Sequence, residues 1–237
     1  MLDEEGEDRT QAADLRLACL LAGVAGALNT AGFRAAGYFT ANMTGNVSLV
    51  SHEFALGNIL LGLFYLTIVI LFVAGALASS LLINAGRRRH GRSIYAYSIL
   101  AEALLLFILG CADLWLEAVH SGPIFILGLS FVMGLQNAIV TRISNARIRT
   151  THISGMATDI GIELGKLLDI RLGKSPQSDK APNLAKLWLH SWTVAAFLLG
   201  GIIGVAIYDE IGGLLLLCAA ALLFAIALPP IGEERSA

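Results

Sequence analysis

The sequence predicts an all-α membrane protein with six transmembrane helices, arranged as two inverted three-helix repeats that each carry a polar re-entrant or broken-helix motif. Three observations lead to this fold: an apolar composition, six long apolar runs, and a polar motif that occurs twice. Of the 237 residues, 56% are hydrophobic and 14% are charged, whereas soluble domains carry about 25% charged residues. The mean hydropathy is +0.73. Such a chain belongs in a lipid bilayer.

Six runs are long enough to cross a bilayer, which takes about 17 to 25 apolar residues. They are Leu17–Phe33, Phe54–Gly86, Ser93–Cys111, Gly122–Thr141, Leu187–Tyr208 and Ile211–Ile231. The acidic residues 1–14 before the first run lack the basic start and cleavage site of a signal peptide. We therefore expect the first run to stay in the mature protein.

The positions of Lys and Arg orient the chain, because cytoplasmic loops retain positive charge. With an internal N-terminus, fifteen of the sixteen Lys and Arg residues fall inside and only Arg34 falls outside. They gather in Arg87–Arg92 and between Arg142 and Lys186. The sequence thus predicts a multi-pass membrane protein with both termini in the cytoplasm.

The chain also contains an internal repeat. Gly26–Arg34 and Gly134–Arg142 share the pattern G-x-x-N-x-x-x-x-R at an offset of 108 residues. The motif "TANMTGN" (40–46) aligns with "TTHISGM" (150–156) at an offset of 110. Because the matches occur in the same order in both halves, the chain looks like two copies of one unit.

Each copy holds three spans, an odd number, so the second copy lies upside down relative to the first. Many secondary transporters are built from such inverted repeats, with the substrate site near the midplane. A third aligned pair, Phe72–Ser80 and Phe197–Val205, carries small residues suited to close helix packing. The expected segments are the acidic tail 1–14, the first repeat 15–113, the second repeat 114–231 with a cytoplasmic linker at 171–183, and the tail 232–237.

The repeated motif is polar although apolar spans flank it. Backbone that leaves the helical form inside a membrane must be buried in protein or line a wet cavity. We expect short helices to begin near Thr44 and Ser154, with N-termini that point inward and favour anions. The alternative is that each motif opens an additional span, which gives four crossings per half and a parallel repeat.

The strings "FTANMTGNV", "MGLQNA" and "TTHISG" resemble the YoaK-like family of bacterial integral membrane proteins, a family of unknown function. The resemblance covers residues 17–228 and supports the architecture, but it implies no substrate. The resemblance also implies a location in the bacterial inner membrane. The family pattern has an aspartate in the first span where this chain has Asn29, and this departure argues against a role that needs a negative charge there, such as cation or proton binding.

We expect a central solute site formed by the two motifs and the spans before them. The candidate substrate-binding residues are Asn29, Arg34, Thr40, Asn42, Thr44, Asn46, Gln136, Asn137, Thr150, His152 and Ser154. The two aligned asparagines equally suit hydrogen bonds between helices. Arg34 lies at a span end, where arginine commonly reaches the headgroups.

Glu102 is the one carboxylate well inside a predicted span. Ionisable residues at such depth usually face a cavity or a partner. Glu102 is therefore a candidate proton- or ion-coupling residue, and holding helices together is the equal alternative. His152 has no second ligand at usable spacing, so we expect no metal site.

The leading hypothesis is a small secondary transporter, with a small anionic or carboxylate solute slightly favoured. A structural or partner-binding membrane protein, or a channel, is the alternative. An integral-membrane enzyme ranks lower, because the sequence contains no HExxH, GxSxG or paired-carboxylate pattern. We expect no enzymatic activity, no cofactor and no nucleic-acid partner; the bilayer and a solute are the expected partners, and the sequence leaves a homodimer open.

Overall fold

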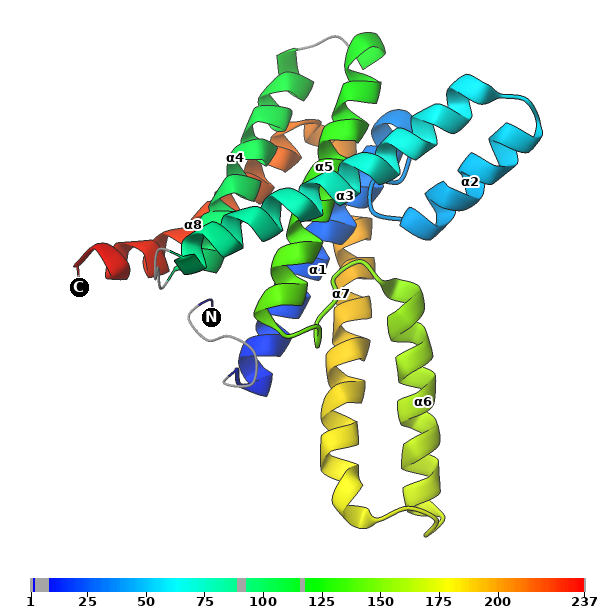
Figure 1. The fold of residues 1–237 in the computed structure, drawn as a ribbon, viewed down its shortest axis with the longest axis vertical. Coiled ribbons are helices and arrows are strands. Elements are labelled where there is room, and N and C mark those ends of the chain that lie inside the picture. The colour runs from blue at the N-terminus through cyan, green and yellow to red at the C-terminus, as the bar shows by residue number, and fades with distance from the viewer. Residues whose placement is uncertain (1, 3–8, 89–92, 116–117, 237) are drawn as a thin grey trace.

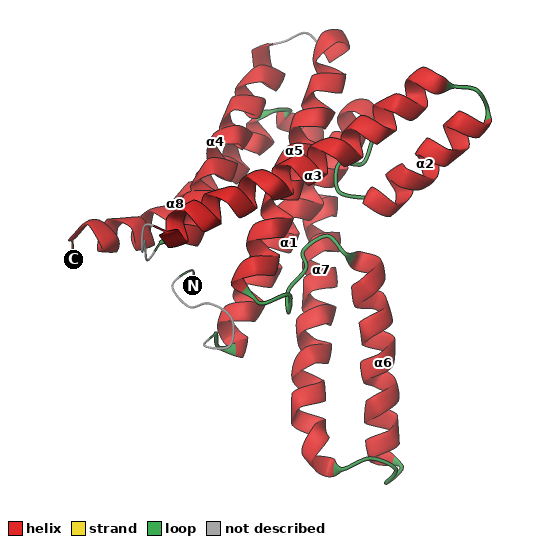
Figure 2. Ribbon diagram, in the orientation of Figure 1, coloured by secondary structure: helices red, strands yellow, loops and turns green. Residues whose placement is uncertain are grey.

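The computed structural model describes residues 2, 9–88, 93–115 and 118–236. All regular structure in these ranges is helical, as Figure 2 shows, which confirms the all-α prediction. The elements are α1 (Gln11–Ala36), α2 (Met43–Ala55), α3 (Ile59–Arg88), α4 (Ile94–Trp115), α5 (Ala118–Ile143), α6 (Ile153–Arg171), the 3-10 turn η2 (Gln177–Asp179), α7 (Lys180–Ile211) and α8 (Leu214–Ser236). Most of the acidic tail, the end of the Arg87–Arg92 cluster and Ala237 lie outside the described residues.

Six helical segments in the described ranges are long and apolar enough to cross a membrane, and each overlaps one predicted run. They are Gln11–Ala36, Ile59–Arg88, Ile94–Trp115, Gly122–Ile143, Gln177–Ile211 and Leu214–Gly232. The second predicted run, Phe54–Gly86, is interrupted near its start. Gly57 adopts a left-handed φ of 79° between α2 and α3, so the spanning helix begins only at Ile59.

Helices α2 and α6 follow the two polar motifs. They begin at Met43 and Ile153, which confirms the predicted helix starts near Thr44 and Ser154. α2 has 13 residues, about 20 Å at the usual rise per residue, and is shorter than the roughly 30 Å hydrocarbon core. Each folds back along the first part of the next long helix, α2 on α3 and α6 on α7, so that two helical hairpins project from the centre (Figure 1).

The expected linker at 171–183 is shorter than its boundaries suggest. Arg171 is the last residue of α6, and α7 already begins at Lys180. Within the linker, only 172–179 lie outside the α-helices, and Gln177–Asp179 there form the 3-10 turn.

Helices α3 and α5 cross with their backbones in contact. A Cβ atom added to Gly75 would overlap the carbonyl of Phe131, and one added to Gly134 would overlap the carbonyl of Phe72. Only glycine fits at such a crossing, because any side chain would force the two helices apart.

Helices α1 and α7 cross in the same way. A Cβ atom on Gly26 would overlap the carbonyl of Phe197, and one on Gly200 would overlap the carbonyl of Gly23. Gly26 aligns with Gly134, and Gly200 with Gly75, so aligned glycines make equivalent crossings in the two halves of the chain.

The outer surfaces of α3 and α7 are apolar and exposed. Only 17% of the most apolar window of each helix is buried within the protein. Leu60 on α3 is 86% exposed, and Leu198 on α7 is 61% exposed. Such surfaces are what lipid-facing helices present, since hydrocarbon tails solvate apolar side chains.

Candidate functional site

A cavity of about 680 Å³ lies where the two polar motifs meet. Its walls come from α1, α3, α5 and α7, from the starts of α2 and α6, and from the loops that precede them. The lining residues are Asn29, Phe39, Ala41, Asn42, Met43, Thr44, Gly45, Ser48, Phe72, Asn137, Thr141, Arg149, Thr151, His152, Ile153, Ser154 and Phe197.

Asn29 fixes the first motif against α1. Its Oδ1 accepts hydrogen bonds from the backbone N–H of Thr40 at 3.0 Å and of Ala41 at 2.9 Å. All three residues are buried. The side chain thereby supplies the acceptor that this non-helical backbone requires inside the protein.

Asn137 holds the second motif in a similar way. Its Oδ1 accepts from the hydroxyl of Thr151 at 2.9 Å, and its Nδ2 donates to the carbonyl of Met133 at 2.8 Å. Thr151 aligns with Ala41. The two aligned asparagines therefore hold aligned loop positions, the first through backbone donors and the second through a side chain.

The glycines of the motifs make room for the residues that open α2 and α6. Asn42 is the N-cap of α2, and its Oδ1 accepts from the N–H of Gly45 at 3.1 Å. A Cβ atom on Gly45 would overlap this Asn42 side chain, and one on Gly155 would overlap the ring of His152. The shared glycine is thus explained by the side chain three residues earlier, which lies over the first turn.

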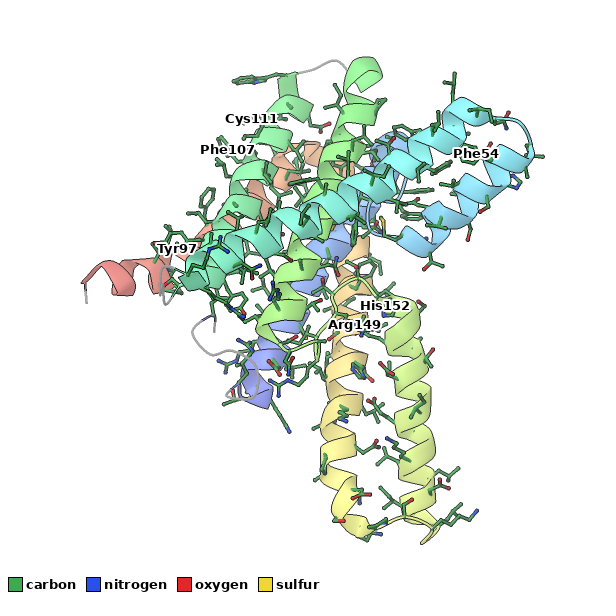
Figure 3. The ribbon with its side chains drawn as sticks, viewed as in Figure 1. Phe54, Tyr97, Phe107, Cys111, Arg149 and His152 are labelled. Carbon is green, nitrogen blue, oxygen red and sulfur yellow. The ribbon has the colours of Figure 1, made fainter. Side chains whose placement is uncertain are left out.

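Arg149 lies in the loop just before α6, beside His152, as Figure 3 shows. Its Nη1 is 3.2 Å from Nδ1 of His152. This contact requires the histidine tautomer in which Nδ1 is an acceptor. His152 is the N-cap residue of α6 but makes no side-chain cap hydrogen bond. Within the described ranges, Arg149 has no carboxylate within ion-pair distance.

The loop 144–152 that carries Arg149 is tied to the start of α1. Asp14 is buried there, and its Oδ2 lies 3.2 Å from Nη2 of Arg147. The other oxygen of Asp14 accepts from Nε of Arg9 at 2.7 Å. Within the loop, the N–H of Ile148 donates to the hydroxyl of Ser144 at 3.0 Å. These contacts set the path of the loop toward the cavity.

Six of the eleven sequence-predicted binding residues line the cavity: Asn29, Asn42, Thr44, Asn137, His152 and Ser154. Four others are buried beside it rather than lining it: Thr40, Asn46, Gln136 and Thr150. The Nδ2 of Asn46 donates to the carbonyl of Phe39 at 3.0 Å, and the Nε2 of Gln136 approaches the carbonyl of Leu21 at 3.4 Å.

Arg34 lies apart from the cavity, at the end of α1. Its Nε is 2.7 Å from Oδ1 of Asp209 at the end of α7, and both side chains are largely exposed. Arg34 is thus part of a surface ion pair in the structure.

Glu102, the candidate coupling residue, is fully buried in α4. Neither of its carboxyl oxygens has a hydrogen-bond partner among the described residues. It does not line the cavity. Any coupling by Glu102 must therefore act through the packing of α4 rather than through contact with a solute in this cavity.

Sequence reasoning missed the residues that give the cavity its charge, one of its hydroxyl groups and its aromatic walls, which are Arg149, Thr151, Phe39, Phe72 and Phe197. The repeat alignment contained a signal for several of them. Arg149 directly precedes the second motif and aligns with Phe39, and Phe72 aligns with Phe197. Arg149 is one of several basic residues in its loop, so its sequence pattern indicates a cytoplasmic loop rather than a binding site.

Residues 17–228 match the family described as "Protein of unknown function (DUF1275)". The chain belongs to this family. It is similar to the UPF0700 transmembrane protein YoaK of Bacillus subtilis (strain 168), with 31% identity over 144 residues, which are 60% of this chain and 61% of that protein. The match thus spans about three-fifths of the relative's length. No solved structure matches the chain.

These matches confirm the resemblance carried by the repeated motifs. Together with the six long apolar helices, they identify the chain as a multi-pass membrane protein.

Proposed function

We propose that this protein is a small secondary transporter of the bacterial inner membrane and that its solute binds in the cavity between the two polar motifs. The observation that carries the proposal is the cavity itself. It is large enough for a small organic molecule, since ligand pockets commonly measure about 300 to 1,000 Å³. Both halves of the chain contribute to its lining.

The arrangement of the lining supports an inverted repeat. Most lining residues fall into seven aligned pairs: Asn29 with Asn137, Phe39 with Arg149, Ala41 with Thr151, Asn42 with His152, Met43 with Ile153, Thr44 with Ser154, and Phe72 with Phe197. The equivalent glycine crossings of α1 with α7 and of α3 with α5 support the same relation. Transporters built from inverted repeats bind their substrates at the interface between the repeats.

The proposed topology keeps both termini in the cytoplasm, because this orientation places fifteen of the sixteen Lys and Arg residues inside. In it, α2 and α6 enter from opposite faces of the membrane as re-entrant helices. Among the described residues, the lining contains no Asp or Glu, which favours an anionic or neutral solute over a cation. Lipid covers the exposed faces of α3 and α7.

The alternatives make different demands on the centre of the molecule. A purely structural or partner-binding role calls for a packed centre, whereas a cavity with polar walls lies there. A channel differs from a secondary transporter in that its solute flux does not depend on a coupling ion. Enzymatic hydrolysis calls for an acid–base pair, and the lining offers one histidine without a carboxylate.

The proposal is tested by flux into proteoliposomes after the cavity is blocked. Thr44→Cys and Ser154→Cys are made in a chain whose Cys19, Cys111 and Cys218 are replaced by serine. Uptake is measured across a panel of small carboxylates, phosphate and neutral amides. We expect a bulky thiol reagent to stop uptake in both variants and to spare Ser51→Cys, which is exposed on α2 and outside the lining. No uptake above empty liposomes for any solute would contradict the transporter.

The inverted arrangement is tested by sidedness of labelling. Ser48→Cys and Thr158→Cys occupy aligned positions one turn into α2 and α6. We expect a membrane-impermeant thiol reagent to reach the two cysteines from opposite sides of the membrane. Labelling of both from the same side would favour the parallel repeat with additional spans.

Coupling by Glu102 is tested with Glu102→Gln, which keeps the shape of the side chain and removes its ionisable proton. We expect uptake driven by a pH gradient to be lost while solute exchange at equal pH continues. Unchanged gradient-driven uptake would leave Glu102 with a helix-packing role only.

A further inference from the structure

The two ends of the cavity differ in charge although their residues are aligned. Arg149 and His152 lie at the start of α6, and the aligned positions at the start of α2 are Phe39 and Asn42. Among the lining residues that the structure describes, Arg149 is the only arginine or lysine, and none is acidic. One end of the cavity therefore carries a positive charge that no carboxylate of the lining balances.

The two helix starts reinforce this difference. Asn42 caps α2 and accepts from the N–H of Gly45, so one of the free backbone donors there is already used. At α6, His152 makes no cap hydrogen bond and lies against Arg149 instead. The N–H groups of the first turn of α6 thus have no side-chain acceptor in the described part of the chain, and they lie beside the guanidinium group.

Three phenylalanines line the cavity among its polar residues. Phe72 and Phe197 reach it from the two long helices α3 and α7, and Phe39 reaches it from the first motif. The ring of Phe39 stacks on Phe33 with centroids 4.3 Å apart, which fixes its position in the wall. Three aromatic rings make a surface for an apolar group, whereas inorganic anions such as phosphate gain little from it.

Resting on the solute site proposed above, we propose that the cavity binds a small organic carboxylate with an apolar body. Its carboxylate accepts from the guanidinium of Arg149, which suits carboxylates because its fork of donors pairs with both oxygens. Its apolar body lies against Phe39, Phe72 and Phe197. Thr151, held by Asn137, lies at the same end of the cavity as Arg149.

Binding is measured on the full chain in a phospholipid-free non-ionic detergent, by thermal stabilisation and by calorimetry. The probes are acetate, hexanoate, benzoate and phenylacetate, the neutral amide of each acid, and inorganic phosphate. We expect benzoate, phenylacetate or hexanoate to bind at least about tenfold more tightly than its amide and than acetate or phosphate, since hydrogen bonds to charged groups are the stronger ones. Amides that bind as tightly as the acids, or phosphate that binds best, would overturn the inference and, in the second case, assign the site to phosphate groups such as lipid headgroups.

The residue assignment is tested with matched charge changes. Arg149→Gln should weaken carboxylate binding by about tenfold or more, and Arg149→Lys should fall between it and the parent. Arg171→Gln removes the same charge from the far end of α6, exposed and outside the lining, and should bind as the parent does. Circular dichroism and gel filtration establish that each variant is folded. Unchanged binding by folded Arg149→Gln would refute the assignment.

Binding and flux separate this inference from the transporter proposal. Carboxylate binding that depends on Arg149, without any uptake, would support the carboxylate site and refute the transport function. Uptake of neutral solutes that does not depend on Arg149 would support the transport function and refute the carboxylate assignment.

Discussion

Replacing Asn29 should destabilise the protein more than replacing its aligned partner Asn137. In Asn29→Ala, the backbone N–H groups of Thr40 and Ala41 lose their acceptor. An unmet buried donor costs about 1 to 3 kcal/mol, which gives about 2 to 6 kcal/mol for the pair. Water in the adjoining cavity can accept from one of these N–H groups, so we expect the free energy of unfolding to fall by an amount near the lower end, about 2 kcal/mol.

Asn137→Ala removes the acceptor of the Thr151 hydroxyl, which is half-buried and can rotate toward water in the cavity. It also removes the Nδ2 donor to the carbonyl of Met133, but that carbonyl lies inside α5 and keeps its helical backbone donor. The loss of one such hydrogen bond is about 0.5 to 1.5 kcal/mol. The free energy of unfolding of both variants is measured by titrating SDS into mixed micelles. Asn29→Asp is the control, because its carboxylate keeps an acceptor for both backbone donors. Equal losses for the two alanine variants, or a larger loss for Asn137→Ala, would refute this account of the first motif.

Three further predictions concern packing and charge. Gly134→Ala should lower the free energy of unfolding by about 1 to 3 kcal/mol through overpacking at the helix crossing, whereas Gly161→Ala, with open space around it, should be neutral or stabilising in the same titration. Asp14→Asn should cost about 3 kcal/mol because it breaks a buried ion pair, and exposed Asp169→Asn should leave the midpoint unchanged. Arg34→Gln should cost less than about 1 kcal/mol, since its ion pair is 58% and 43% exposed; a larger thermal shift would give that pair a structural role.

The spans and the helix starts were predictable because they depend on local patterns. Apolar length fixes where a helix can cross the membrane, and the motif residues around Thr44 and Ser154 mark where helices begin. The break at Gly57 was not predicted, because the run Phe54–Gly86 is uncharged and largely apolar apart from Gly57 and Asn58, and a single positive φ divides it.

The site was predictable in part. Asn29 and Asn137 were found because repetition singles out polar residues in apolar helices. Thr40 and Thr150 were also repeated, yet both side chains are buried beside the cavity. The direction of a side chain in a non-helical loop depends on backbone dihedrals that a sequence pattern does not specify. Arg149 was missed because its position depends on how loop 144–152 turns back, which the contacts of Asp14 and Ser144 determine.

The contrast between Phe39 and Arg149 bears on how such a cavity can arise. In a two-fold pair of identical single units, an arginine at this position would occur twice, and two guanidinium groups facing one small cavity would repel each other. Duplication and fusion into one chain removes that restriction, because each copy then mutates separately. On the proposed inverted repeat, one half carries an aromatic ring and the other a lone cation at the aligned position, which favours a single orientation for the proposed carboxylate.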